Sequence, residues 1–125
     1  MTGTSCRVSK KSDQLAREIA ALIETTDTLR EVLARYKRAN AHLAKRVAQG
    51  ESVLEAFEGL DGAMRRHREL TETLEEFEAA RHEVRVALFA LSTAQGASLS
   101  ELGRRLGISR QLASRLAAQA DERNP

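Results

Sequence analysis

Apolar residues recur along the first half of the chain in one unbroken pattern. From Ser12, a residue suited to capping a helix, the steps between successive positions alternate between four and three. This heptad spacing keeps one stripe of a helix against a partner helix. The stripe contains Leu15, Ile19, Leu22, Thr26, Leu29, Leu33, Tyr36, Asn40, Leu43 and Val47. Because the spacing continues through Gly50 to Phe57, it predicts a helix over residues 12–58, with Gly50 inside it at a cost of about 1 kcal/mol relative to alanine.

A reversal of the chain is predicted at residues 59–62, where the sequence is Gly-Leu-Asp-Gly. A second series follows the reversal and predicts a helix over residues 63–95. Its members are Leu70, Leu74, Phe77, Arg81, Val84, Leu88 and Leu91. We therefore expect a coiled-coil helical hairpin over residues 12–83, preceded by a disordered basic tail at residues 1–11.

Charge is divided unevenly along the chain, although the net charge is only +2. Basic residues outnumber acidic ones by ten to five in the first fifty residues and by six to three from Val84 onward, whereas acidic residues outnumber basic ones by ten to four in between. Folding at the predicted reversal lays the acidic run from Glu69 to Glu83 along the basic stretch from Arg35 to Arg46, with Glu78 near Lys45. Exposed ion pairs contribute only about 0.2–1 kcal/mol each, so these charges set the orientation of the hairpin more than its stability.

Self-association is also predicted, because neither long helix alone buries enough apolar surface. A homodimer or higher oligomer would cover the rest of the stripe, and the alternative is a monomeric hairpin that packs on the C-terminal domain. The predicted dimerisation residues are Leu15, Ile19, Leu22, Leu29, Leu33, Tyr36, Asn40, Leu43 and Val47. Asn40 occupies an a position of the heptad, where a buried asparagine sets register by bonding to its counterpart. The alternative for Asn40 is a place at the solvated edge of the stripe.

The segment from Ser98 to Leu116 is predicted to form two short helices joined by a tight turn. Ser98 and Glu101 have the spacing of a capping box, Gly107 ends the first helix, and Ser109 caps the second. The apolar interior consists of Leu99, Leu102, Leu106, Ile108, Leu112 and Leu116, with Gly103 and Ala113 small enough for the helices to cross closely. With the end of the preceding helix, these elements form a predicted three-helix domain over residues 84–120, followed by a tail at residues 121–125.

This segment resembles bacterial helix-turn-helix transcription factors, and it looks most like the lactose-repressor class. The resemblance covers about 20 residues and lies in Gly103, Gly107, Ile108 and Ser109, although alanine is more usual in that family where Gly103 stands. It implies that the second short helix reads DNA. The positions that match base-contacting residues of the family are Arg110, Gln111 and Arg115.

The residue types support the same interpretation. The helix after Ser109 presents Arg110, Gln111, Ser114 and Arg115 on the side opposite its apolar residues, and Arg and Gln bond bidentately to guanine and adenine in the major groove. These four residues are the predicted base-reading set. The predicted phosphate contacts are Ser100, Arg104, Arg105 and Ser109.

Composition excludes several other classes of protein. Ala, Glu, Lys, Leu and Arg make up 70 of the 125 residues, the only proline is Pro125, and aromatic residues make up 3%, so we expect an all-α fold. The single Cys6 excludes an internal disulfide and fits a reducing compartment. No apolar run is long enough for a membrane span or a secretory signal, so we expect a protein of the cytoplasm, located at the nucleoid.

Catalytic and cofactor-binding motifs are absent from the sequence, and we expect neither an enzyme nor a cofactor. His42, His67 and His82 stand apart from any metal-ligand spacing, so no metal site is expected. The sequence therefore predicts sequence-specific binding of double-stranded DNA by a dimeric transcription regulator or nucleoid-associated protein. The alternative is an adaptor whose coiled coil binds a protein assembly and whose short helices dock a protein partner.

Overall fold

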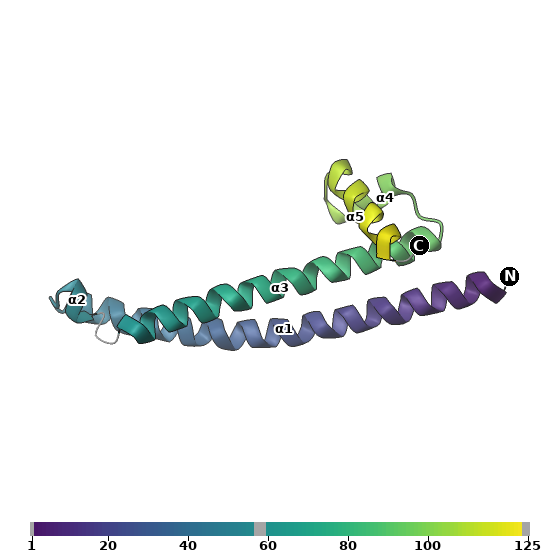
Figure 1. The fold of residues 1–125 in the computed structure, drawn as a ribbon. Helices are drawn as coiled ribbons and strands as arrows, with labels where there is room; N and C mark the ends of the chain where they lie inside the picture. The colour runs from purple at the N-terminus through teal and green to yellow at the C-terminus, as the bar shows by residue number, and fades with distance from the viewer. Residues whose placement is uncertain (1, 57–59, 124–125) are drawn as a thin grey trace. The chain divides into compact units, whose positions relative to one another are not determined.

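The computed structural model describes residues 2–56 and 60–123, and all the regular structure in these residues is helical (Figure 1). The elements are α1 (Thr2–Ala48), α2 (Val53–Ala56), α3 (Leu60–Ala94), α4 (Leu99–Leu106) and α5 (Arg110–Arg123). The predicted all-α class is confirmed. It follows from a sequence rich in strong helix formers that has no proline before its last residue.

The chain divides into two compact units. The hairpin unit comprises residues 23–78, and the terminal unit comprises residues 1–22 together with residues 79–125. Both long helices, α1 and α3, pass from one unit into the other. This division differs from the predicted boundary between residues 83 and 84, because the start of α1 belongs with the C-terminal helices.

The prediction of a disordered tail at residues 1–11 is wrong, since α1 is helical from Thr2. Within the described side chains of this segment, Val8 and Lys11 are half-buried, as are Leu15 and Leu22 further along the helix. Val8 lies seven residues before Leu15, so it extends the apolar stripe by one heptad. That extension, and the lack of proline, are the physical reasons why the helix begins so early.

The end of α1 is a second correction, because Gly50 does not lie inside a helix. The helix ends at Ala48, and Gly50 takes a left-handed φ of 90°. The Gly50 N–H donates to the Val47 carbonyl at 3.1 Å, and the Glu51 N–H donates to the Arg46 carbonyl at 3.3 Å. These two bonds form a Schellman motif, which satisfies carbonyls at the helix end and needs a residue that adopts positive φ at low cost.

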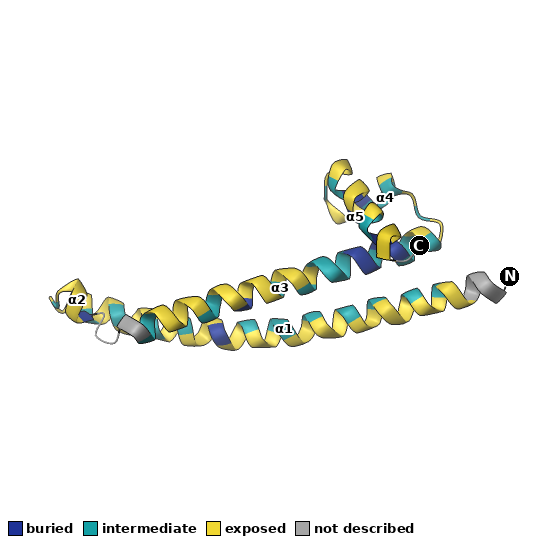
Figure 2. Ribbon diagram, viewed as in Figure 1, coloured by how far each residue is buried: buried dark blue, intermediate teal, exposed yellow. Residues whose placement is uncertain are grey.

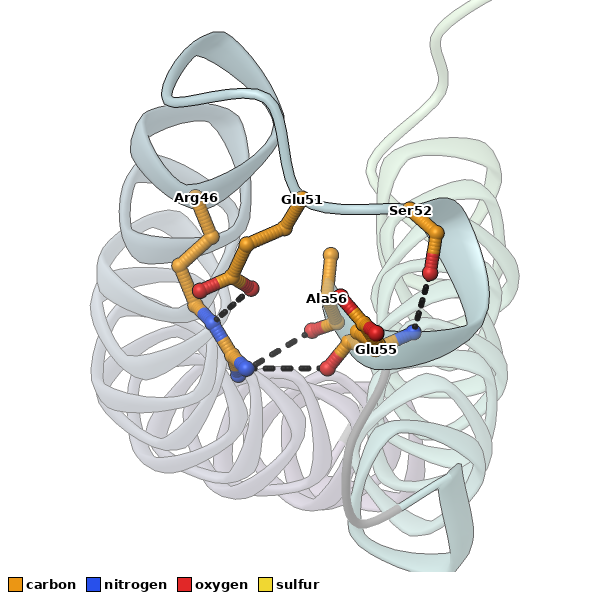
Figure 3. Close-up of polar contacts among 5 residues, drawn as sticks. All are labelled: Arg46, Glu51, Ser52, Glu55 and Ala56. Carbon is orange, nitrogen blue, oxygen red and sulfur yellow. Dashed lines mark hydrogen bonds and ion pairs between the residues drawn. The ribbon is translucent and has the colours of Figure 1, made fainter.

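Arg46 closes the tip of the hairpin unit (Figure 3). Its Nε donates to Glu51 Oε2 at 2.7 Å, and its two terminal nitrogens donate to the backbone carbonyls of Glu55 at 2.8 Å and Ala56 at 3.3 Å. Ser52 Oγ accepts a hydrogen bond of 3.2 Å from the Glu55 N–H and so caps the single turn of α2. One guanidinium therefore joins the end of α1 to Glu51 and to the last residues of α2.

The reversal of the chain lies earlier than predicted. Arg35 Nη2 lies 2.5 Å from Glu69 Oε1, and these residues are equally distant from position 52. Glu69 therefore faces Arg35, and the predicted placement of Glu78 near Lys45 is wrong. Of the predicted reversal at residues 59–62, Gly59 lies outside the described residues, and the remaining three residues form the start of α3. The cause is the Schellman motif, which turns the chain at Gly50 instead.

The core of the terminal unit lies between the end of α3, α4 and α5 (Figure 2). Phe89 and Leu116 are its largest fully buried side chains. The other buried members are Val86, Ala90, Ala113 and Ala120, and the partly buried residues packed against them include Leu99, Leu102, Ile108 and Leu112. Burying a side chain such as Phe89 or Leu116 contributes about 1.5–3 kcal/mol, which makes this cluster the main source of stability in the unit.

Polar contacts also join α3 to the last turns of α5. His82 Nε2 lies 2.7 Å from Gln119 Oε1, and Arg123 pairs with Glu83. The partners in each pair are 37 and 40 residues apart in sequence. These two contacts therefore hold the C-terminal part of α5 against α3. The first turns of α5 take no part in them.

Candidate nucleic-acid interface

The first short helix, α4, begins at a serine cap. Ser98 has extended backbone angles, and its hydroxyl oxygen accepts a hydrogen bond of 3.2 Å from the Glu101 N–H. This hydrogen bond is one of the two that make up the predicted capping box, the one accepted by the serine side chain. The Glu101 carboxylate pairs with Arg105 Nη2 at 3.3 Å, one turn further along the helix. Glu101 therefore neutralises part of the charge on Arg105.

The turn between α4 and α5 agrees with the sequence prediction. Gly107 has a φ of 67°, and the Ile108 N–H donates to the Gly103 carbonyl at 3.0 Å. Ser109 Oγ accepts a hydrogen bond of 3.1 Å from the Leu112 N–H, so Ser109 caps α5. Because both helix ends in this turn are satisfied locally, the three residues from Gly107 to Ser109 define how α5 leaves α4.

Gly103 is the small residue at which α4 and α5 approach each other, and it is buried. A Cβ atom placed on Gly103 would lie 3.5 Å from the Ile108 carbonyl oxygen and 3.7 Å from the Ala113 Cβ. These are ordinary van der Waals distances. The site therefore requires a small side chain but has room for one methyl group.

The four predicted base-reading residues lie together on α5. Arg110, Gln111, Ser114 and Arg115 are all exposed and line one shallow groove. The buried residues Ala113, Leu116 and Ala120 follow the opposite side of the helix. The exposed side of the first turns of α5 therefore carries two positive charges and two hydrogen-bonding groups, held in place by a helix whose other side is packed.

The predicted phosphate contacts lie next to this face in sequence. Ser100, Arg104 and Arg105 are exposed on α4, and Ser109 is exposed at the start of α5. The Ser109 hydroxyl oxygen already accepts the Leu112 N–H, so its remaining function in binding is as a donor. Arg105 would have to give up its ion pair with Glu101 to bind a phosphate. Arg104 is therefore the arginine of α4 that is better placed for a phosphate contact.

The predicted dimerisation residues separate into two groups in the single chain. Those at one heptad position are half-buried: Leu15, Leu22, Leu29, Tyr36 and Leu43. Those at the other are exposed: Ile19, Leu33, Asn40 and Val47. The Asn40 Nδ2 donates to the Tyr36 carbonyl at 3.0 Å, so this side chain is satisfied within its own helix. In the single chain Asn40 therefore lies at the solvated edge of the stripe.

Sequence reasoning missed a groove in the terminal unit that is lined by four basic residues and by Asp13 and Asp121. The basic residues are Arg7, Lys10, Lys11 and Arg17 of α1, and the groove also includes Ala90 and Thr93 of α3 and Ala120 of α5. The sequence predicts a disordered tail up to residue 11, so it places Arg7, Lys10 and Lys11 outside any helix. The heptad position of Val8 is the signal that would have placed these basic residues on a helix.

Among the described residues, no group of three His, Cys, Asp or Glu side chains is arranged to hold a metal ion. None of the helices, over the residues described, combines the length and apolar character needed to cross a membrane. Cys6 is exposed and is not in a disulfide.

Comparison of the chain with models of known protein families, with curated proteins and with solved structures finds no match. Two features of the terminal unit bear on function. One is the turn that sets α5 on α4, and the other is the exposed polar face at the beginning of α5.

Proposed function

We propose that this chain binds double-stranded DNA sequence-specifically, as a transcription regulator or nucleoid-associated protein of the cytoplasm. One observation carries the proposal. Arg110, Gln111, Ser114 and Arg115 share an exposed face of α5, while the opposite side of the same helix is buried in the core. A helix held in this way presents its polar side chains in a fixed order, which sequence reading requires.

The chemistry of the face suits the edges of base pairs. The guanidinium groups of Arg110 and Arg115 bond bidentately to guanine, and the amide of Gln111 bonds bidentately to adenine. The Ser114 hydroxyl donates to or accepts from either base. The major groove is wide enough to admit a helix such as α5, and the first turns are the part of a recognition helix that contacts base edges.

Backbone contacts would position α5 in the groove. In the proposal, Ser100, Arg104, Arg105 and Ser109 bind phosphates on either side of the groove. The N–H groups at the start of α5 add partial positive charge next to Ser109. The pairing of α4 and α5 across a three-residue turn, together with the end of α3, has the order of a helix-turn-helix domain, in line with the resemblance to the lactose-repressor class.

The test is selection from a library of random duplexes, with the full chain and two variants. We expect the full chain to select a motif, and Arg110→Ala to lose about 1–3 kcal/mol of discrimination at one position of it. Arg65→Ala is the matched control, because Arg65 is an exposed arginine of the hairpin unit. Its removal changes the net charge equally and should leave the motif intact.

Two results would contradict the proposal. The first is no binding of duplexes even at low salt, where phosphate contacts are strongest. The second is binding whose sequence preference is the same in the full chain and in Arg110→Ala. The first result would favour the alternative function, an adaptor that uses the same short helices to dock a protein.

A further inference from the structure

Charge in the hairpin unit is divided along the length of its helices. The half that contains the connection, residues 35–68, carries eight Lys and Arg against four Asp and Glu. The other half consists of residues 23–34 and 69–78, and it carries one arginine against eight acidic residues. The half with the connection therefore has an excess of positive charge, which attracts anions.

The acidic residues of this basic half lie in the connection and the first turn of α3. The segments 35–50 and 62–68, which approach each other from α1 and α3, contain no Asp or Glu. Arg35 pairs with Glu69, and Arg46 pairs with Glu51. The other basic residues of the two segments are all exposed: Lys37, Arg38, Lys45, Arg65, Arg66 and Arg68.

A hollow of about 660 Å³ lies in the basic half and is lined by both long helices. Its volume is in the range of sites for small molecules, about 300–1,000 Å³. Among the residues described, its lining contains three arginines and two histidines but no Asp or Glu. We call it the interhelical hollow. Its lining would favour an anionic ligand.

The cations at the interhelical hollow are all arginines. Arg46 is engaged by Glu51 and by two backbone carbonyls, so it holds the tip together. Arg66 and Arg68 form no ion pair with any carboxylate described in residues 2–56 and 62–123. A guanidinium presents two parallel N–H donors that match the oxygens of a phosphate. Arg66 and Arg68 are therefore the groups available to an anionic ligand.

The rest of the lining includes an apolar wall. Tyr36 and Leu43 of α1 are half-buried, and Met64 of α3 is 55% exposed. An aromatic ring stacks on other flat rings, and the unbranched thioether of methionine adapts its shape to them. The interhelical hollow thus combines arginines with a wall suited to a flat apolar body.

Two polar side chains in the interhelical hollow have acceptor oxygens left over. The Asn40 Nδ2 donates to the Tyr36 carbonyl, and the Thr71 hydroxyl donates to the His67 carbonyl, both at 3.0 Å. Their donors are used in these bonds, whereas the Asn40 Oδ1 and the Thr71 Oγ1 retain the capacity to accept. The exocyclic amino groups of adenine, guanine and cytosine are donors that match such acceptors.

We propose that the interhelical hollow binds a free nucleoside phosphate. Its base lies against Tyr36 and Met64, and its phosphates bind Arg66 and Arg68. Three features together select this class of ligand: arginine donors for phosphate, a wall for a flat ring, and acceptors for the amino group of a base. The proposal is independent of DNA binding, because it uses only residues of the hairpin unit.

The first test is isothermal titration calorimetry of the full chain with ATP, GTP and CTP, in the absence of divalent cations. Tripolyphosphate and adenosine are the matched partial ligands, since each carries one part of ATP. We expect at least one nucleotide to bind at least about tenfold more tightly than tripolyphosphate or adenosine. Equal affinity for tripolyphosphate, or no binding of any nucleotide at about 1 mM, would overturn the proposal.

The second test locates the site with variants. Arg66→Ala should raise the nucleotide dissociation constant by about tenfold, because it removes hydrogen bonds from a charged donor. Arg65→Ala is the matched control, since Arg65 is the neighbouring exposed arginine and does not line the interhelical hollow. Met64→Trp should also weaken binding without a change of charge, because the larger side chain fills the hollow.

Circular dichroism checks that these variants keep their helical content. A loss of affinity in Arg65→Ala as large as that in Arg66→Ala would mean that net charge alone attracts the nucleotide, and it would overturn the proposed site. Unchanged binding by Met64→Trp would do the same. Arg110→Ala should bind nucleotide as the unaltered chain does, so the result is separate from the outcome for DNA binding.

Discussion

The Arg46 side chain donates a hydrogen bond of 2.8 Å to the backbone carbonyl of Glu55, nine residues further along the chain. The same guanidinium also bonds to Glu51 and to the Ala56 carbonyl. A single side chain of α1 therefore bonds to three groups of the connection between α1 and α3. This arrangement makes the tip of the hairpin unit sensitive to one substitution.

Arg46→Ala should lower the free energy of unfolding by about 1–3 kcal/mol, because it removes hydrogen bonds from a charged donor to a carboxylate and to carbonyls. Urea denaturation followed by circular dichroism measures this loss. Arg38→Ala, an exposed arginine on the same helix, should change stability by less than about 0.5 kcal/mol. Equal effects of the two variants would mean that the tip contacts contribute nothing specific.

Gly50→Ala should also destabilise the chain, by about 1–2 kcal/mol. Space is not the cause, since a Cβ atom on Gly50 would have nothing within 4 Å. The cause is the φ of 90°, which residues with a side chain rarely adopt. Thermal unfolding of Gly50→Ala beside the unaltered chain tests this, and an unchanged melting temperature would count against the Schellman motif at the end of α1.

Gly103→Ala should raise the free energy of unfolding, in contrast to Gly50→Ala. The added methyl group makes only ordinary contacts with Ile108 and Ala113, and alanine favours the helix by about 0.5–1 kcal/mol over glycine. Gly103→Leu should destabilise the chain, because the larger side chain does not fit between α4 and α5. If both variants were destabilising to the same degree, the helices would have to approach more closely than described.

Phe89→Ala should cost about 3–5 kcal/mol, since Phe89 is fully buried and its removal leaves a cavity in the core of the terminal unit. Leu106→Ala is the control, as Leu106 is 44% exposed at the end of α4, and it should cost less than about 1 kcal/mol. Denaturant unfolding of both variants distinguishes a packed core from a loose association of α3 with α4 and α5.

Arg104→Ala should weaken DNA binding without changing the selected motif. The loss of one phosphate contact lowers the slope of log affinity against log salt by about 1. Arg105→Ala should have a smaller effect, because Arg105 pairs with Glu101 in the free protein. Fluorescence anisotropy at several salt concentrations measures both slopes, and a shift in base preference with Arg104→Ala would place that residue in the groove instead.

The beginnings of the two short C-terminal helices and the turn between them could be predicted almost residue by residue, because they depend on local chemistry. Ser98, Gly107 and Ser109 act on groups no more than four residues away, so their types identify their positions. The end of α5 could not be predicted, since this helix continues to Arg123, into the predicted tail at residues 121–125. The tip of the hairpin unit could not be predicted in this way. A heptad pattern passes through Gly50 without a break, and neither the pattern nor the glycine indicates that Arg46 would find acceptors in residues 51–56.

The sequence also did not predict which residues of the apolar stripe on α1 would be half-buried and which would be exposed. The d positions there are Leu or Tyr throughout and the a positions include Thr26 and Asn40, but a heptad pattern gives the surface of the helix and not the direction from which α3 approaches it. In the structure Tyr36 is half-buried, whereas Leu33 and Asn40 are exposed. What separates them is the direction from which α3 approaches, and this is set by the connection at the tip.

The bonds made by Arg46 have a consequence for the order of folding. They close loops of five, nine and ten residues, whereas the ion pair between Arg35 and Glu69 closes one of 34. A loop of about ten residues closes in roughly 10–100 ns, much faster than chains of this size collapse. The connection after α1 is therefore able to close before the two long helices meet.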